Sequence, residues 1–415
     1  MKPIIVFLLI VITGLTADCK DKPRSNVQPA NSIEDSTLTA AINQFTFDLY
    51  GKLDAKRQAN IFFSPFSIAT ALTMTYGGAR GETALEMANA LHIANLGERV
   101  HPAFCTLLES LPHSLIKDTV NELALANGIW VQQRYPFVPA FLDLVKNDYA
   151  AVAEPVDFLD AANREAARLH INKWVEERTR NNIKNLLNED DLTSLNRAVL
   201  CNAIYFYGRW EFPFDTGRTK VDTFTTVSGG KVAVPMMHMR AKRTLRYTED
   251  TTAQILELPY ADSLTSLVII LPRKGVSLAD VEQKLSAEIL QKWTSDWSIP
   301  SMEIGISLPR FKIDERYYLK KPLKELGIQR AFDGADFTGI SPTKELYISN
   351  VIHQAMVEVN EQGTKAVAAT AVTLVAYSMP RLIEFSADHP FVFMIRHKST
   401  GAILFMGRVA SPTAM

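Results

Sequence analysis

One stretch near the C-terminus limits how this chain can fold, because fifteen consecutive residues, from Ala366 to Pro380, carry no charge. They lie between Lys365 and Arg381 and are almost all small, β-branched or apolar. A soluble protein normally buries such a run or interrupts it with charges, since an exposed apolar strand pairs with other chains. The fold therefore has to account for where this segment goes.

Read as a β-strand, the segment has two faces on which successive side chains alternate. Every side chain on the first face is small or apolar and suits a packed interior, whereas the second face carries the lone charge near one end. The segment is thus compatible with insertion into a sheet, although its composition also fits a permanent core strand or a buried helix. The first face holds Thr364, Ala366, Ala368, Thr370, Val372, Leu374 and Ala376, and the second holds Gly363, Lys365, Val367, Ala369, Ala371, Thr373, Val375 and Tyr377.

The composition is that of a globular protein with one large core. The chain has 415 residues, of which 47% are hydrophobic and 21% are charged. No linker-like segment interrupts residues 37–415, so we predict a single domain there. The net charge is −1 and the two signs are interspersed, which argues against nucleic acid or an anionic membrane as a partner.

The N-terminus, MKPIIVFLLIVITGLTADC, is typical of an export signal. We predict a signal peptide over residues 1–18 and a flexible tether over residues 19–36; a short buried helix is the alternative for the apolar run. Cys19 follows directly, as in a bacterial lipoprotein, although Asp18 occupies a position where that motif favours a small neutral residue. We expect an exported protein, extracellular or in the cell envelope, and either lipid-anchored at Cys19 or cleaved and secreted.

The chain reads as helices early and strands late, which indicates an α+β fold. Helical spacing covers residues 37–53, 64–79 and 171–187. β-Branched and aromatic runs dominate from residue 196 onward. The predicted strand regions are 196–210, 252–260, 264–272, 302–313, 345–360 and 391–409.

No motif in the sequence indicates an enzyme. The eight histidines form no HExxH pair, and Cys105 and Cys201 lie in separate apolar stretches that suit neither a zinc site nor a disulfide framework. GxSxG and GxxxxGK[ST] motifs are absent, and GGARGET at 77–83 follows a helical pattern, where it is better read as a helix end. We expect no catalytic residues, metal or cofactor, and no basic helix suggests a glycosaminoglycan partner.

Several long motifs resemble the serpin family over essentially the whole mature chain, in family order. The resemblance implies three β-sheets and about nine helices, a monomer, and an exposed reactive-centre loop at about 361–386. The motifs are NIFFSPFSIATALTMTYGGARGET, INKWVEERT, LCNAIYFYGRWEFPF, ISLPRFKI, HQAMVEVNEQGTKA and FSADHPFVFMIRHKSTGAILFMGRV.

The resemblance implies a suicide-type inhibitor of serine proteases that are chymotrypsin- or elastase-like, with cross-inhibition of cysteine proteases allowed. The protease attacks the loop and forms an acyl-enzyme, and the freed segment then enters the main sheet as a new strand. Some fifteen inserted residues would carry the tethered protease about 50 Å. A non-inhibitory binding or chaperone protein with the same fold is the alternative.

The loop hinge decides between these functions, because a large or charged side chain on the inward face would be costly to bury. Here the inward residues are small or β-branched, as in the inhibitory members. Lys365 and Val367 depart from the family pattern, but both fall on the outward face. The hinge residues carried over from the family are Glu361, Gly363, Thr364, Ala366, Ala368 and Thr370.

Counting the family's usual loop length from Glu361 places the reactive bond between Tyr377 and Ser378. Counting back from the His389-Pro390-Phe391 motif instead selects the bond between Met379 and Pro380. Val375 or Ala376 would suit an elastase-like protease, and Arg381 would suit a trypsin-like one only with a longer insert.

Two supporting clusters are also implied by the resemblance. The shutter, under the middle of the main sheet where strands must part, comprises Ser64, Ser67, Asn202 and His353. The breach, where the loop first enters the sheet, comprises Trp210, Arg310 and Glu361. We expect Arg310 and Glu361 to pair, and His353 to be a hydrogen-bonded switch residue rather than a catalytic base.

Overall fold

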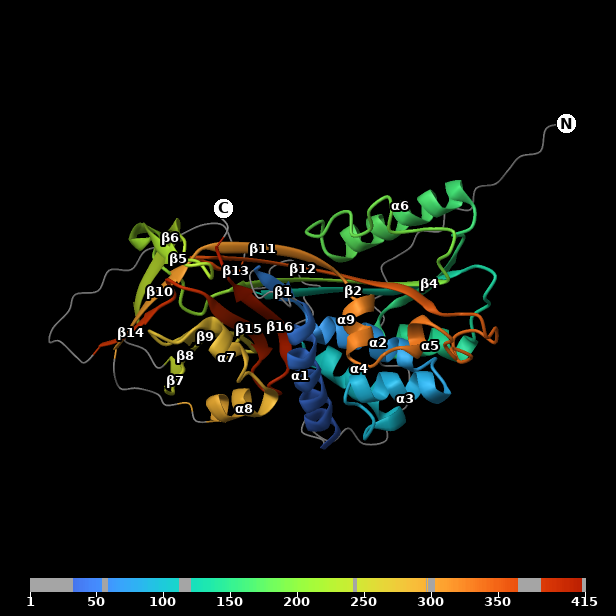
Figure 1. Cartoon of the computed structure of the whole chain (residues 1–415), viewed down its shortest axis with the longest axis horizontal. Coiled ribbons are helices and arrows are strands. Elements are labelled where there is room, and N and C mark those ends of the chain that lie inside the picture. The colour runs from blue at the N-terminus through green and yellow to red at the C-terminus, as the bar shows by residue number, and fades with distance from the viewer. Residues whose placement is uncertain are drawn as a thin grey trace.

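The computed structural model describes residues 33–53, 59–111, 121–241, 245–295, 297, 303–364 and 382–412. Within them the chain forms nine α-helices and three β-sheets in a mixed α+β arrangement, which confirms the predicted fold class (Figure 1). The predicted signal peptide, residues 1–18, lies outside the described residues.

Local sequence explains where a central helix begins and ends. The Ser64 side chain accepts a hydrogen bond from the backbone N–H of Ser67, and Pro65 occupies the first helical position, as helix starts favour. The helix ends before Gly77. The helices of the described residues are α1 (Ile33–Leu53), α2 (Pro65–Tyr76), α3 (Gly81–Ala90), α4 (Val100–Ser110), α5 (Pro139–Tyr149), α6 (Ala161–Arg178), α7 (Leu278–Glu282), α8 (Ala287–Ser295) and α9 (Lys320–Glu325), with short 3₁₀ turns at Gly97–Arg99, Thr216–Arg218 and Arg330–Phe332.

The main sheet has six strands and runs along the length of the molecule (Figure 1). Its strand order is β11, β12, β13, β4, β2, β3, so segments far apart in the sequence become neighbours. The strands are β11 (Phe311–Tyr318), β12 (Ile348–Asn360), β13 (Gly363–Thr364), β4 (Ala198–Arg209), β2 (Asn121–Gln132) and β3 (Val152–Val156).

Two further sheets complete the β-structure. The second sheet has the order β1, β16, β15, β9, β8, β7, and the third has the order β14, β10, β6, β5. The second sheet comprises β1 (Ile61–Phe63), β16 (Ile403–Val409), β15 (Phe391–His397), β9 (Thr265–Pro272), β8 (Ala253–Pro259) and β7 (Arg246–Glu249), and the third comprises β14 (Leu382–Ser386), β10 (Glu303–Pro309), β6 (Lys231–Ala241) and β5 (Lys220–Thr225).

Aromatic side chains join the main sheet to the second sheet. Phe62 stacks on Phe405 with ring centroids 5.3 Å apart, and Phe405 also meets Phe206 of β4 at 5.9 Å. All three rings are buried, so together they bring several hundred Å² of apolar surface out of water. One face of the main sheet is thereby fixed to a rigid support.

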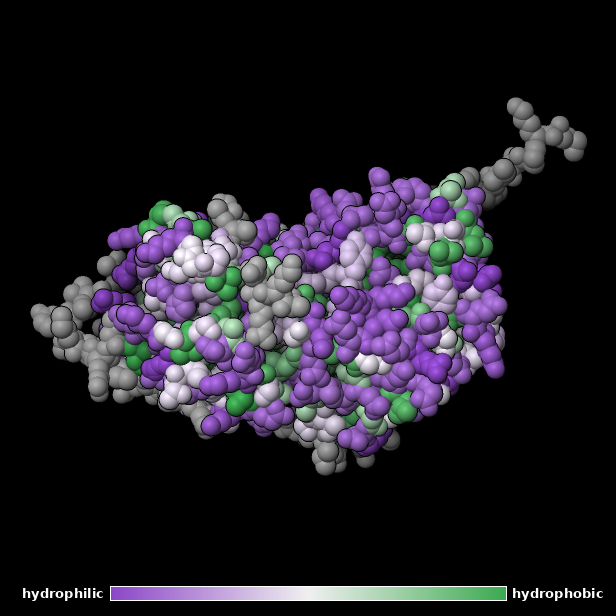
Figure 2. All heavy atoms as spheres, viewed as in Figure 1, coloured by the Kyte–Doolittle hydropathy of each residue, from purple (hydrophilic) through white to green (hydrophobic). Residues whose placement is uncertain are grey.

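Helix α6 covers part of the opposite face of the main sheet (Figure 1). A second hydrophobic cluster lies beneath it and includes Ile171 and Val175 of the helix, Val199 of β4 and Ile352 of β12. Figure 2 shows a surface on which hydrophilic residues predominate and hydrophobic ones are scattered. Among the described helices, none combines the length and the apolar character that a membrane crossing would require.

Three expectations about the fold are wrong in detail. Helix α1 begins at Ile33, so residues 33–36 of the predicted tether are helical. Residues 30–53 contain no proline that would interrupt a helix. The helical pattern over 171–187 stops at Arg178, because Arg180 and other residues just after it adopt positive φ. Strands β2 and β3 are exceptions to the mainly helical reading of the first half of the chain.

Candidate functional site

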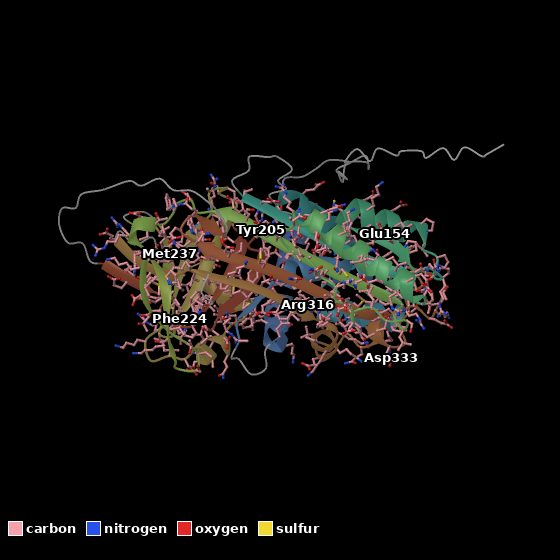
Figure 3. All side chains as sticks on the ribbon, turned by 90° about the horizontal axis from the view of Figure 1, so that it is seen from above. Glu154, Tyr205, Phe224, Met237, Arg316 and Asp333 are labelled. Atoms are coloured by element: carbon pink, nitrogen blue, oxygen red, sulfur yellow. The ribbon has the colours of Figure 1, made fainter. Side chains whose placement is uncertain are left out.

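Strands β4 and β12 are parallel neighbours in the main sheet and form a ladder that we call the seam. The seam runs from the pair Ala198–Ile348 to the pair Tyr205–Met356. Figure 3 looks down on this sheet and labels Tyr205. A chain that entered between two parallel strands from their C-terminal ends would run antiparallel to both, and antiparallel pairing is slightly more stable per residue.

Strand β13 already lies between β4 and β12, just beyond the end of the seam at Tyr205 and Met356. Thr364 pairs with Val359 of β12 on one side and with Gly208 of β4 on the other, antiparallel to both. Gly363 adopts φ +148°, and a Cβ atom there would lie 2.0 Å from the carbonyl oxygen of Gly208. Only glycine fits this position, which explains the residue in backbone terms.

Thr364 is fully buried where β13 pairs with β4 and β12. Its hydroxyl lies 2.8 Å from the hydroxyl of Tyr260, which packs between Trp210 and Phe206 at centroid distances of 4.8 and 5.0 Å. Burial raises the pKa of Tyr260 far above its usual value, so the phenol stays neutral. The pocket for Thr364 is therefore small and uncharged.

The breach residues surround β13 and the turn before it. Trp210 donates from its backbone N–H to Gln362 at 3.0 Å and from its indole Nε1 to the carbonyl of Asn360 at 2.9 Å. Arg310 donates from Nε to Oε1 of Glu361 at 2.8 Å, and Thr219 donates to the same oxygen. Trp210, Arg310 and Glu361 thus lie together at the point where β12 turns into β13.

The Glu361 carboxylate is ionised despite its burial. Its side chain is 4% exposed, whereas that of Arg310 is 34% exposed. Burial by itself raises the pKa of Glu361, but the hydrogen bonds from Arg310 and Thr219 outweigh it and hold the pKa below its usual value. Since the carboxylate is buried, loss of its Arg310 partner would leave an uncompensated buried charge, which costs more than the loss of an exposed ion pair.

The shutter residues form one buried network across the seam. His353 and Asn202 stand directly opposite each other in the β12–β4 ladder, and His353 Nδ1 is hydrogen-bonded to Asn202 Oδ1. Ser64 donates its backbone N–H to His353 Nε2 at 3.0 Å, and Asn202 Nδ2 donates to the carbonyl of Ser67 at 3.1 Å. The network therefore ties β12, β4 and the start of α2 together.

His353 is neutral because of these partners. Nε2 accepts the proton of an N–H group, so the imidazole proton must be on Nδ1, where it points to Asn202. Burial lowers the pKa of His353 to about 3. The ring thus suits a hydrogen-bonded joint between two strands, and no described nucleophile is bonded to it.

Other predicted residues lie outside the described residues, so their roles stay predictions. They are Cys19, Lys365, Ala366, Val367, Ala368, Thr370, Val375, Ala376, Tyr377, Ser378, Met379, Pro380 and Arg381.

The ends of the predicted loop, 361–386, are not exposed loop in the structure. Gly363 and Thr364 are paired in the main sheet, and β14 (Leu382–Ser386) pairs in parallel with β10 of the third sheet. Both ends are anchored because side chains on one face of each short strand, such as Thr364 and Phe385, are buried.

Sequence reasoning missed three residues of the site. Asn127 of β2 contacts Asn202 Nδ2 through Oδ1, Thr219 bonds Glu361, and Tyr260 bonds Thr364. The alternation in NELALANGIWVQ could have indicated a strand with Asn127 on its buried side. Thr219 and Tyr260 carry no local signal, since their partners are more than a hundred residues away. Among the described residues, no group of three or more His, Cys, Asp and Glu side chains is arranged to hold a metal.

The shutter makes stability depend on pH. Because the folded pKa of His353 is about 3 and the ordinary value is 6.5, the unfolded chain binds more protons between these values, and stability is lost as pH falls below 6.5. We expect this residue to remove about 2 kcal/mol of unfolding free energy between pH 7 and pH 5. Urea titrations of the wild type and His353→Asn at both pH values measure it; an equal pH dependence in the two proteins would contradict it.

The breach ion pair should resist opening of the sheet. Glu361→Ala removes the carboxylate that holds Arg310 and Thr219, so we expect spontaneous insertion or polymerisation to begin at a temperature lower by roughly 5 °C. Native gels after heating measure the polymers. Glu325→Ala, which removes a weak, exposed pair with Lys321, is the control. Unchanged polymer formation in Glu361→Ala would count against this role.

Comparisons with known proteins agree with this architecture. The profile described as "Serpin (serine protease inhibitor)" matches residues 40–412. Bovine leukocyte elastase inhibitor is 41% identical over 382 residues, covering 90% of this chain and 99% of the relative. The structure of a serpin from the insect Tenebrio molitor is similar with TM-score 0.81 and 32% identity, covering 92% of this chain and all of the other. Human thyroxine-binding globulin has TM-score 0.81 and 29% identity, covering 92% of this chain and all of the other. A profile match over most of the chain and near full-length relatives show that this protein belongs to the serpin family.

Proposed function

We propose that this protein inhibits serine proteases by inserting its cleaved reactive-centre loop into the seam between β4 and β12. The observation that carries the proposal is β13, whose Gly363 and Thr364 already pair antiparallel with both seam strands. Cleavage of the loop would free the residues that follow to continue in the same direction. One parallel ladder would then be exchanged for two antiparallel ladders.

The register of β13 supports this path. Six residues beyond Thr364, the same register would bring Thr370 level with Asn202 of β4 and His353 of β12, on the face that Thr364 presents to the core. Opening the seam breaks the bond between Asn202 and His353. The hydroxyl of Thr370 is both donor and acceptor, so it could replace the lost partner of each.

The size of the inward side chains supports inhibition over the alternative function. The alternative function, binding or chaperone activity without trapping, is suggested only by the name of one structural neighbour, thyroxine-binding globulin. In this chain the inward hinge residues Thr364, Ala366 and Ala368 are small, which favours rapid insertion before the acyl-enzyme is hydrolysed. We assign no catalytic residues to the chain itself.

The target class follows from the loop. Tyr377 before Ser378 suits a chymotrypsin-like protease, and Val375 or Ala376 suits an elastase-like one, in line with the name of the leukocyte elastase inhibitors among the relatives. Cysteine proteases are secondary targets in this proposal. The bond between Met379 and Pro380 is the alternative reactive site.

Trapping can be tested with chymotrypsin and a pancreatic or leukocyte elastase. We expect an SDS-resistant complex and a released fragment spanning residues 378–415, whose mass identifies the bond. Thr364→Arg places a charge in a fully buried site and should turn the inhibitor into a substrate, whereas Lys365→Glu, on the outward face, should keep trapping. Cleavage without a stable complex in the wild type would overturn the proposal, as would a cut form no more heat-stable than the intact one.

We also propose that the protein is a monomer and that the signal peptide at residues 1–18 directs its export from the cytoplasm. The mass of the N-terminal peptide after expression in a bacterial host tests this. Removal of residues 1–18 is expected, with a diacylglyceryl group on Cys19 if the chain is anchored and an unmodified Cys19 if it is secreted. An intact N-terminus at Met1 would contradict export.

A further inference from the structure

Helix α6 and residues 179–195, which we call the strap, cross the seam on the face opposite the second sheet. The cluster beneath the strap contains Val199, Cys201 and Ala203 of β4 and Ile352 of β12, so it touches both sides of the seam. Opening the seam to admit one strand would separate the two sides by about 4.8 Å. Contacts of the strap with both sides cannot all survive that separation.

The contacts with the β4 side are extensive. The cluster places Ala126 and Trp130 of β2, besides three residues of β4, against the strap. At the edge of this half, His170 Nε2 lies 2.8 Å from Oε2 of Glu154 on β3, and Arg180 Nε lies 2.5 Å from Oε1 of Glu122 on β2. Figure 3 labels Glu154 beside α6.

The contacts with the β12 side are fewer and mostly polar. Tyr318 of β11 donates its hydroxyl to Oδ1 of Asp191 at 2.7 Å. Arg316 of β11, labelled in Figure 3, donates from Nη1 to the carbonyl of Leu186 at 3.2 Å and lies 3.8 Å from Oδ2 of Asp191. Among the described residues of β12, Ile352 alone belongs to the apolar cluster.

The Asp191 carboxylate is the centre of this second attachment. Its side chain is 8% exposed, and it also accepts the backbone N–H of Asn188 at 2.6 Å within the strap. In the β11–β12 ladder, Arg316 and Tyr318 stand opposite Gln354 and Ile352, on either side of the level of His353. The attachment therefore lies at the height of the shutter, halfway along the path of insertion.

We infer that Asp191, Arg316 and Tyr318 form a latch that holds the strap across the closed seam and must release before the loop can insert past the shutter. This inference rests on the proposed function. Because apolar contact is concentrated on the β4 side, the strap stays with β2, β3 and β4 and parts from β11 as the seam widens. The three are positioning residues, since they act through the strap and touch no protease.

A synthetic peptide with the sequence of residues 364–376 tests the latch without a protease. Its uptake into the intact protein at 37 °C is followed on urea gels, because a filled seam resists urea. We expect Tyr318→Phe and Asp191→Asn to take up the peptide roughly three- to tenfold faster than the wild type, the range that one hydrogen bond supplies. Tyr247→Phe, which removes a tyrosine–carboxylate bond to Glu249 in the second sheet, is the matched control and should not change the rate.

A variant on the other side tests the direction of release. His170→Gln weakens the attachment to Glu154 and should accelerate uptake less than Tyr318→Phe does. Equal rates for Tyr318→Phe and the wild type, a larger effect of His170→Gln, or no uptake by any of the proteins would each overturn the latch. Failure of the proposed function would look different: the wild type would then form no SDS-resistant complex, whatever the peptide rates.

Discussion

The parallel ladder between β4 and β12 is the interaction on which the rest of the structure depends. Parallel pairing is slightly less stable per residue than antiparallel pairing, so a strand inserted antiparallel to both β4 and β12 would form stronger ladders than these two strands form with each other. β13 occupies the first two positions of that strand. The closed seam is therefore a state held by other contacts: the Arg310–Glu361 pair at its upper end, the His353–Asn202 bond in its middle and the strap across one face.

The first two of these closing contacts are polar, as are the contacts of the strap with Arg316 and Tyr318 of β11, whereas the supports on either side are apolar. The aromatic contacts of Phe62 and Phe405 bind one face of the sheet to a rigid second sheet. A hydrogen bond across the seam can be exchanged for one with an incoming backbone or hydroxyl, but a broken apolar contact leaves a cavity until it is filled. In the proposed mechanism, polar closure with apolar support lets one sheet adopt two arrangements without unfolding the rest.

The sequence predicted the fold class, and it grouped residues that the structure brings together without predicting their geometry. Ser64, Ser67, Asn202 and His353 could be grouped from family motifs, and the structure places them within hydrogen-bond reach of one another. The early strands β2 and β3 were missed: β3 is only five residues long and contains a proline, and the alternation in β2 was overlooked. That Thr364 is already inside the sheet could not be read from the chain, since the pocket formed by Tyr260, Trp210 and Phe206 is assembled by tertiary packing.

What the sequence determined by itself is local: the alternation along residues 363–377 and the small inward side chains. Each depends only on neighbouring residues and on backbone sterics. What the tertiary structure decided is which two strands flank the segment, in which direction it pairs, and which groups meet it. His353 and Asn202 are 151 residues apart in the chain, and only the packing of the main sheet on its support makes them neighbours.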